Sequence, residues 1–169
     1  MKKYLLGLLL CVTLVIPVTA NDNLVSLKYE IPFGSGFQYE GTIGDNIYGG
    51  YYSNLKGDIG TTKVEITTFG LDWVSYGKNF SGFYWGAGAS YNTINLKQNL
   101  LVEYEANILY PYLNGGYSLL IGNFNAKLGA KVGYGFGELE LKAGNQSIKS
   151  DWDPKGFLPS IYFSLGFAF

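Results

Sequence analysis

Large apolar residues alternate with small or polar residues over long stretches of the chain. Within Phe157–Phe169 the odd positions are large and apolar, apart from one proline, and the even positions are mostly small or weakly polar. Phe83–Asn92 and Phe124–Gly137 alternate in the same way, and Lys127 and Lys131 lie opposite the aromatic residues of the latter. Because successive side chains of a β-strand point to opposite faces, these patterns predict strands with one apolar face.

Eight stretches of this kind predict an all-β fold, a single antiparallel eight-stranded up-and-down transmembrane β-barrel. The predicted strands are Leu24–Pro32, Gly36–Thr42, Asn46–Leu55, Thr62–Ser75, Gly82–Leu96, Glu103–Leu119, Asn123–Lys142 and Gly156–Phe169. An even number is typical of single-chain bacterial barrels, and side chains can fill an interior of this size. An alternative merges Gly34–Gly60 into one long loop and leaves six strands.

Two of the predicted strands contain an irregularity. In Thr62–Ser75 the alternation changes parity near Thr67–Phe69, which indicates either a β-bulge or an arm that rises above the membrane. The same ambiguity lies around Ile108–Leu113, where Pro111 removes a donor from the hydrogen-bond ladder.

The connections between the strands predict the topology, because small barrels have short turns on the periplasmic side and longer loops outside. The short connections are Gly44–Asn46, Tyr76–Ser81 and Ile121–Asn123, and the longer ones are Lys56–Thr61, Lys97–Val102 and Ala143–Lys155. Both termini then lie in the periplasm. Aromatic residues near that side predict a lower girdle at the lipid headgroups: Trp73, Tyr76, Phe83, Trp85, Tyr117, Phe124, Phe167 and Phe169. Trp152, in the last outer loop, fits either a partner contact or an outer girdle.

The first twenty residues have the pattern of a cleaved signal peptide. Lys2 and Lys3 precede an apolar run that ends at Val15, and Val18–Ala20 fits a cleavage site. We therefore expect a signal peptide over residues 1–20 and one barrel domain over residues 21–169. The single cysteine, Cys11, lies in the leader, so the mature chain would hold neither a disulfide nor a thiolate metal site.

The composition agrees with a membrane barrel and argues against an enzyme. Aromatic residues make up 17% of the chain, charged residues only 15%, and glycine occurs 24 times. The chain has no histidine, which removes the commonest general base and metal ligand. We therefore expect no catalytic residues, no metal and no cofactor. The 12 lysines, two of them in the leader, face 13 acidic residues, so a nucleic-acid partner is not expected.

Charged residues on the inner face of the strands are the candidate functional feature. Lys127 and Lys131 should point into the barrel, and Asp72, Lys28 and Glu30 are the candidates to share that interior with them. Our hypothesis is a cluster of ion pairs that plugs the barrel, because buried charge is costly unless it is paired and hydrogen-bonded. The alternative is a wet pore lined by charge, which the narrow interior of an eight-stranded barrel disfavours.

The last eight residues, Tyr162–Phe169, resemble the C-terminal insertion signal of Gram-negative outer-membrane proteins. In that family the signal has an apolar residue at every second position and a terminal phenylalanine, and the barrel-assembly machinery reads it. Phe163, Leu165, Phe167 and Phe169 would carry the signal here. The whole mature chain is similar in pattern to the small barrels typified by the membrane domain of OmpA, OmpX and OmpW.

This resemblance implies a location in the outer membrane, in contact with its lipid and lipopolysaccharide. It implies a structural or surface-interaction role, in which outer loops meet an extracellular partner. The alternative is a small passive channel for hydrophobic compounds, which the resemblance to OmpW implies. A lipid-modifying enzyme within the barrel is the third hypothesis, and the absence of histidine argues against it.

Overall fold

Long antiparallel strands account for nearly all of the described chain. The computed structural model describes residues 22–44, 46–98, 102–143, 146–149 and 155–169. The strands are β1 (Asn23–Ile31), β2 (Gly34–Ile43), β3 (Asn46–Ile59), β4 (Thr62–Lys78), β5 (Ser81–Gln98), β6 (Val102–Ile121), β7 (Phe124–Ala143), β8 (Gln146–Lys149) and β9 (Gly156–Ala168). Among these residues no helix has the length and hydropathy needed to cross a membrane.

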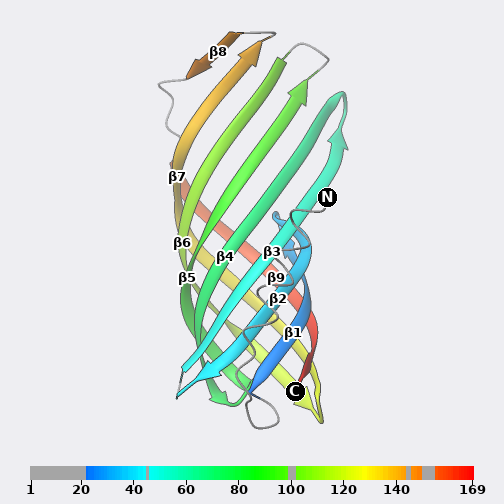
Figure 1. Ribbon diagram of the computed structural model, residues 1–169, viewed down its shortest axis with the longest axis vertical. Coiled ribbons are helices and arrows are strands. Elements are labelled where there is room, and N and C mark those ends of the chain that lie inside the picture. The colour runs from blue at the N-terminus through cyan, green and yellow to red at the C-terminus, as the bar shows by residue number, and fades with distance from the viewer. Residues whose placement is uncertain (1–21, 45, 99–101, 144–145, 150–154) are drawn as a thin grey trace.

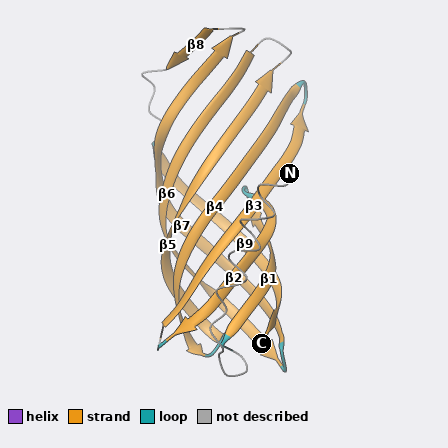
Figure 2. Ribbon diagram, viewed as in Figure 1, coloured by secondary structure: helices purple, strands orange, loops and turns teal. Residues whose placement is uncertain are grey.

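Eight of the strands close into a barrel (Figures 1 and 2). From β1 to β7 each strand pairs with the next, β7 pairs with β9, and β9 pairs with β1. The ring therefore has no open edge along its closed part. The predicted eight-stranded up-and-down barrel is confirmed, and the six-strand alternative is wrong because β2 pairs with β3 over nine residue pairs, from Ser35↔Asn54 to Ile43↔Asn46.

Two predicted outer loops differ from the structure. β3 continues to Ile59 and β4 begins at Thr62, so Lys56–Thr61 is mostly strand, with a tight turn at Gly60. Within Ala143–Lys155, the short strand β8 pairs with the end of β7. Both corrections have one cause, since antiparallel strands can continue beyond the closed ring as hairpins. The predicted signal peptide, Cys11 and Trp152 lie outside the described residues.

Both described ends of the chain lie at one end of the barrel, which we call the terminal end. Asn23 and Phe169 exchange two backbone hydrogen bonds of 3.1 and 2.9 Å there. Short turns at Gly44, Asn79–Phe80 and Gly122–Asn123 connect the strands at the same end. At the opposite end, which we call the raised end, β3–β7 extend well beyond β1, β2 and β9 (Figure 1).

The two faces of the strands differ sharply in polarity along the closed part of the barrel. Outward residues such as Leu27, Leu71 and Ile161 are 60–62% exposed. Inward residues are buried and largely polar or tyrosine. An exterior band of apolar residues therefore surrounds a polar interior, which reverses the arrangement of a water-soluble domain.

The exterior band ends at one row of residues near the raised end, which we call the aromatic row. Across β3–β7 the aromatic row consists of Tyr52, Phe69, Tyr91, Leu109 and Phe136, which are neighbours in the register. The next outward row is polar and consists of Asn54, Thr67, Thr93, Asn107 and Glu138. We call the parts of β3–β7 beyond the aromatic row (53–59, 62–68, 92–98, 102–108 and 137–143) the raised wall.

The parity change near Thr67–Phe69 is this boundary, and no bulge lies there. β4 keeps one register with β3 from Thr62 to Val74. Phe69 ends the apolar exterior, whereas Ile66 points inward from the raised wall and is 8% exposed. The predicted bulge is therefore wrong, and the first part of β4 belongs to the raised wall; that this arm rises above a membrane stays a prediction.

Pro111 occupies the middle of β6 without shifting the register. β6 and β7 pair at Leu109↔Phe136 and again at Tyr112↔Gly133, and the pairing lapses at Tyr110 and Pro111. On the other side of the strand Pro111 still lies opposite Ala89 of β5. The missing N–H thus interrupts the ladder to one neighbour only.

The aromatic residues predicted to form a lower girdle lie on the exterior of the barrel, with one exception. Phe83, Trp85, Tyr117 and Phe124 are exposed at 49–79% near the terminal end. Tyr76 is the exception, because it lies on the inward parity of β4 and its hydroxyl donates to the buried Glu40. Its assignment to the girdle is therefore wrong.

The narrow interior leads to a prediction about Gly129 of β7. A Cβ at this position would overlap the Tyr84 hydroxyl and lie 2.7 Å from Cζ of Tyr162. We expect Gly129→Leu to lower the free energy of unfolding by about 1–3 kcal/mol through overpacking. Ala130→Leu, on the exposed face of the same strand, should have little effect. Urea unfolding of the refolded protein measures both, and equal losses would contradict a filled interior at Gly129.

Candidate functional site

The interior of the closed barrel holds three lysines and three carboxylates, all buried. They are Lys28, Glu30, Glu40, Asp72, Lys127 and Lys131, none more than 4% exposed. Five of them are the residues that the sequence pattern placed in the interior. The sixth, Glu40, was missed because the strand that carries it was among the weakest in the pattern. The alternation of Phe37 and Tyr39 with Gln38 and Glu40 is the signal that could have found it.

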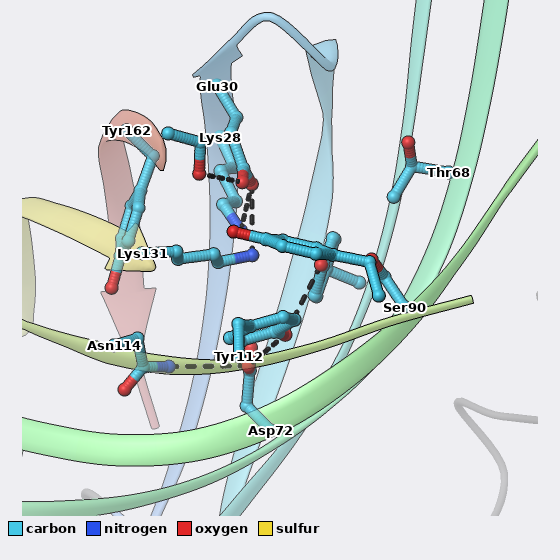
Figure 3. A network of polar contacts seen from close by, with 12 residues as sticks. Lys28, Glu30, Thr68, Asp72, Ser90, Tyr112, Asn114, Lys131 and Tyr162 are labelled. Carbon is cyan, nitrogen blue, oxygen red and sulfur yellow. Dashed lines mark hydrogen bonds and ion pairs between the residues drawn. The ribbon is translucent and has the colours of Figure 1, made fainter. Parts of the chain in front are cut away.

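Glu30 is the centre of the cluster nearer the raised end (Figure 3). Its Oε2 lies 2.7 Å from Lys28 Nζ and 3.0 Å from Lys131 Nζ. Ser160 donates a hydrogen bond of 2.7 Å to Oε1 of the same carboxylate. One carboxylate therefore binds two ammonium groups that come from β1 and β7, on opposite sides of β9.

Asp72 is held by neutral donors, whereas the sequence hypothesis grouped it with the lysines as an ion pair. The hydroxyl of Tyr112 donates to Oδ1 of Asp72, and the side-chain amide of Asn114 donates to the same atom over 3.3 Å. The hydroxyl oxygen of Tyr112 also lies 3.2 Å from the hydroxyl oxygen of Tyr51. Asp72 is thus connected through Tyr112 to Tyr51, whose ring lies against the lysine ammonium groups. Figure 3 shows Tyr112 and Asn114 directed at Asp72.

A second ion pair lies nearer the terminal end. Lys127 Nζ is 2.5 Å from Oε2 of Glu40, and the hydroxyl of Tyr76 donates to Oε1 of Glu40 over 3.0 Å. These atoms come from β7, β2 and β4, so the contact crosses the interior. Lys127 therefore binds Glu40 and lies in a different cluster from Lys131.

Tyrosine rings surround the lysine ammonium groups. Lys28 Nζ lies 3.7 Å from the ring centroid of Tyr51, and Lys131 Nζ lies 3.9 Å from the same centroid and 4.4 Å from that of Tyr112. The negative face of an aromatic ring attracts a cation, and more strongly away from water. Lys28 and Lys131 share one carboxylate oxygen of Glu30. The tyrosine rings therefore add to the stabilisation of their two positive charges.

Apolar side chains close the charged interior toward the raised end. Phe33, Tyr51, Ile66, Tyr110 and Tyr112 form one buried cluster, which we call the floor of the raised wall. Tyr110 is fully buried, and its hydroxyl donates to the carbonyl of Leu158 over 2.5 Å. This bond ties the floor to β9, at the side where the raised wall is missing.

A turn residue closes the interior toward the terminal end. Phe80 is fully buried with Leu24, Ile47 and Ala168, although it belongs to the β4–β5 turn. Its φ of 49° is rare for a residue with a bulky side chain. The hydroxyl of Ser118 and the side-chain amide of Asn125 donate hydrogen bonds of 2.7 and 2.9 Å to the carbonyl oxygen of Phe80. These bonds hold the turn so that the ring of Phe80 points into the terminal end of the barrel.

The buried charges of this interior neutralise one another. Its three lysines balance its three carboxylates, and its remaining polar groups are mostly hydroxyls and amides. Among the described residues no group of three or more His, Cys, Asp or Glu side chains could hold a metal ion. The residues of the predicted insertion signal, Phe163, Leu165, Phe167 and Phe169, lie apart from this cluster and are exposed, the first three on β9 and the last directly after it.

The fold defines a closed eight-stranded antiparallel barrel, and buried charged, polar and tyrosine side chains line its interior. The crystal structure of Acinetobacter baumannii CarO is similar to this chain, with a TM-score of 0.52 and 12% sequence identity. The match covers 92% of this chain and 100% of that chain. At this identity the likeness concerns the fold. No protein-family model and no curated protein matches the chain.

The buried pair of Lys127 and Glu40 generates a prediction about stability. Lys127→Met leaves a buried carboxylate without its cation, so we expect the free energy of unfolding to fall by about 3–5 kcal/mol. Adding Glu40→Gln removes that charge and keeps an acceptor for Tyr76, so it should recover most of the loss. Urea unfolding midpoints of the single and double variants measure the coupling between the two residues.

The exposed ion pair of Lys56 and Glu65 provides the control for this cycle. Its atoms are 2.7 Å apart, but both side chains lie on the outward face of the raised wall. The hydrogen bond from Lys56 lowers the pKa of the Glu65 carboxyl. Solvent screens such a pair, so Lys56→Met should leave the unfolding midpoint unchanged. Equal effects of Lys56→Met and Lys127→Met would show that burial does not set the strength of the inner pair.

Proposed function

We propose that the chain is an integral barrel protein of a bacterial outer membrane, with a structural or surface-interaction role. The observation that carries the proposal is the apolar exterior band around a closed ladder of strands. Within hydrocarbon every backbone N–H and C=O must find a partner inside the protein, which a closed barrel achieves. In water the same exterior would be a large exposed apolar patch, which favours aggregation.

The proposed orientation puts the terminal end in the periplasm and the raised wall outside the cell. The support is the short turns at the terminal end and the long hairpins at the raised end, as in bacterial barrels. The outer boundary of the bilayer would then follow the aromatic row, with the polar row in the headgroup region. Phe163, Leu165, Phe167 and Phe169 would present the insertion signal to the barrel-assembly machinery.

In this proposal the interior is a plug. Its support is the pairing of Glu30 with Lys28 and Lys131, together with the two apolar closures at Phe80 and Tyr110. The partners on the outside would be lipid and lipopolysaccharide around the exterior band and an extracellular partner at the raised end. We assign the chain no enzymatic step, no cofactor and no nucleic-acid partner.

A second candidate is a small passive pathway for hydrophobic compounds. One observation favours it: the inward face of the raised wall carries apolar side chains, among them Ile66, Ile94 and Leu139. The ion-paired interior beneath the floor opposes it, because an apolar solute would have to cross a charged layer. Normal uptake of hydrophobic compounds by a deletion strain would remove this candidate.

A heat-modifiability assay tests the proposed membrane barrel. We expect the mature chain, refolded in detergent, to migrate differently on a denaturing gel before and after boiling, since a closed barrel resists the detergent until it is heated. A chain that shows no shift and stays monomeric and soluble without detergent would contradict the proposal and would favour a secreted β-structure.

Planar-bilayer recordings test the plug. We expect the wild-type protein to show no steady conductance, and Asp72→Ala to raise the conductance, because the acceptor for Tyr112 and Asn114 is removed. Asp58→Ala, on the exposed β3 hairpin, is the matched control and should behave as wild type. An unchanged conductance in Asp72→Ala would remove Asp72 from the plug, and a conducting wild-type protein would overturn the plug altogether.

A further inference from the structure

The raised wall has the opposite amphipathicity to the closed barrel below it. On its outward face the second polar row consists of Lys56, Glu65, Asn95, Glu105 and Glu140, which are neighbours across β3–β7. On the closed barrel the outward residues are apolar and the inward residues polar. The outward face changes at the aromatic row, and the inward face changes one row higher, above the buried polar residues Ser53, Thr68 and Asn92, without any shift in register. The outward face of the raised wall is therefore suited to contact with water.

The inward face of the raised wall carries two apolar rows that span all five strands. The lower row is Leu55, Ile66, Ile94, Ala106 and Leu139. The upper row is Gly57, Val64, Leu96, Tyr104 and Leu141. Leu55, Val64 and Ile94 pack against the floor, and no described side chain of either row is charged. We call this apolar concave face the trough.

The trough is open on the side of β9, β1 and β2. β2 begins at Gly34, so β3 beyond Asn54 has no partner on that side. β9 pairs with β7 only up to Gly156↔Gly135, so β7 has lost that neighbour at the level of the lower row. Among the described residues, three of the eight barrel strands therefore contribute nothing to the wall.

An apolar sill connects the trough to the exterior band at this open side. Phe33 and Leu158 pack in the same cluster as the lower row. Their neighbours Ile31 and Phe157 point outward and are 60% and 66% exposed. A path of apolar side chains thus runs from the band, over the ends of β1 and β9, into the trough.

We propose that the trough binds one alkyl chain of an amphiphile that enters over this sill from the outer leaflet, an inference that rests on the proposed membrane barrel. The sill joins the trough to the band, and in a bilayer the molecules against that band are alkyl chains. The trough offers a chain the same apolar surroundings as the leaflet, and the floor beneath it stops the chain above the charged interior.

Photolabelling in phosphatidylcholine vesicles tests the site. The probe is dodecylamine with a diazirine near the end of its chain, and mass spectrometry maps the adducts. We expect adducts on the exterior band and on trough residues such as Leu96, Tyr104 and Leu141. An excess of unlabelled dodecylamine should remove only the trough adducts, because bulk lipid contacts the band without saturation.

Paired variants separate the trough from the rest of the wall. Leu96→Asn with Leu139→Asn should reduce the competable labelling roughly tenfold, the factor that a loss of about 1.4 kcal/mol gives. Lys97→Asn with Glu138→Asn changes the outward neighbours on the same strands and should leave it unchanged. The heat-dependent gel shift reports whether each variant folds, and the adduct map of the wild-type protein stands without any variant.

The outcomes distinguish this inference from the proposed function. Band adducts without competable trough adducts overturn the alkyl-chain site and leave the membrane barrel intact. Absence of both kinds of adduct, with no heat-dependent shift, means that the proposed function itself has failed.

Discussion

The pairing of β1 with β9 is the constraint on which the rest of the structure depends. It joins the first and last strands and leaves the closed part of the ladder without an edge. Once the ladder is closed, the alternation of side chains divides every strand into an inner and an outer face. Backbone hydrogen bonds are then satisfied within the ring whatever surrounds it, so the outer face can be as apolar as Leu27 and Ile161 make it.

Closure also fixes what the interior can hold. The ring is narrow, so glycine is needed wherever a large inward side chain crosses, as at Gly129 beside Tyr84 and Tyr162. Charges in so small a space must be neutralised by side chains that reach across it. Glu30 binds lysines of β1 and β7, and Glu40 of β2 binds Lys127 of β7. The contact of Glu30 with Lys131 links two strands separated by β9, and the contact of Glu40 with Lys127 links two strands separated by β1 and β9. Tyrosine rings pack around these charges.

The alternation alone predicts the eight strands and the inward direction of Lys127 and Lys131, because period two is a local property of the chain. It does not predict partners across the barrel, since these depend on the relative heights of strands that are distant in sequence. Asp72 was grouped with the lysines for this reason, although Tyr112 and Asn114 bind it. Glu40 was missed because β2 is short and rich in glycine. Tyr76 was misplaced because its nearness to a turn outweighed its inward parity.

The polarity of the outward side chains changes at Phe69, so the alternation along a strand must be interpreted together with the medium that surrounds each part of it. The register of β4 does not change there, but the outward side chain is apolar up to Phe69 and polar from Thr67 onward. Cross-strand pairs such as Lys56 with Glu65 and Lys97 with Glu103 suit a wall that stands in water. Leu55, Val64 and Ile94 have a partner within the protein, because they pack against the floor. Leu96, Tyr104 and Leu141 continue the apolar inner face beyond that packing, and this part of the trough is the surface that meets an alkyl chain.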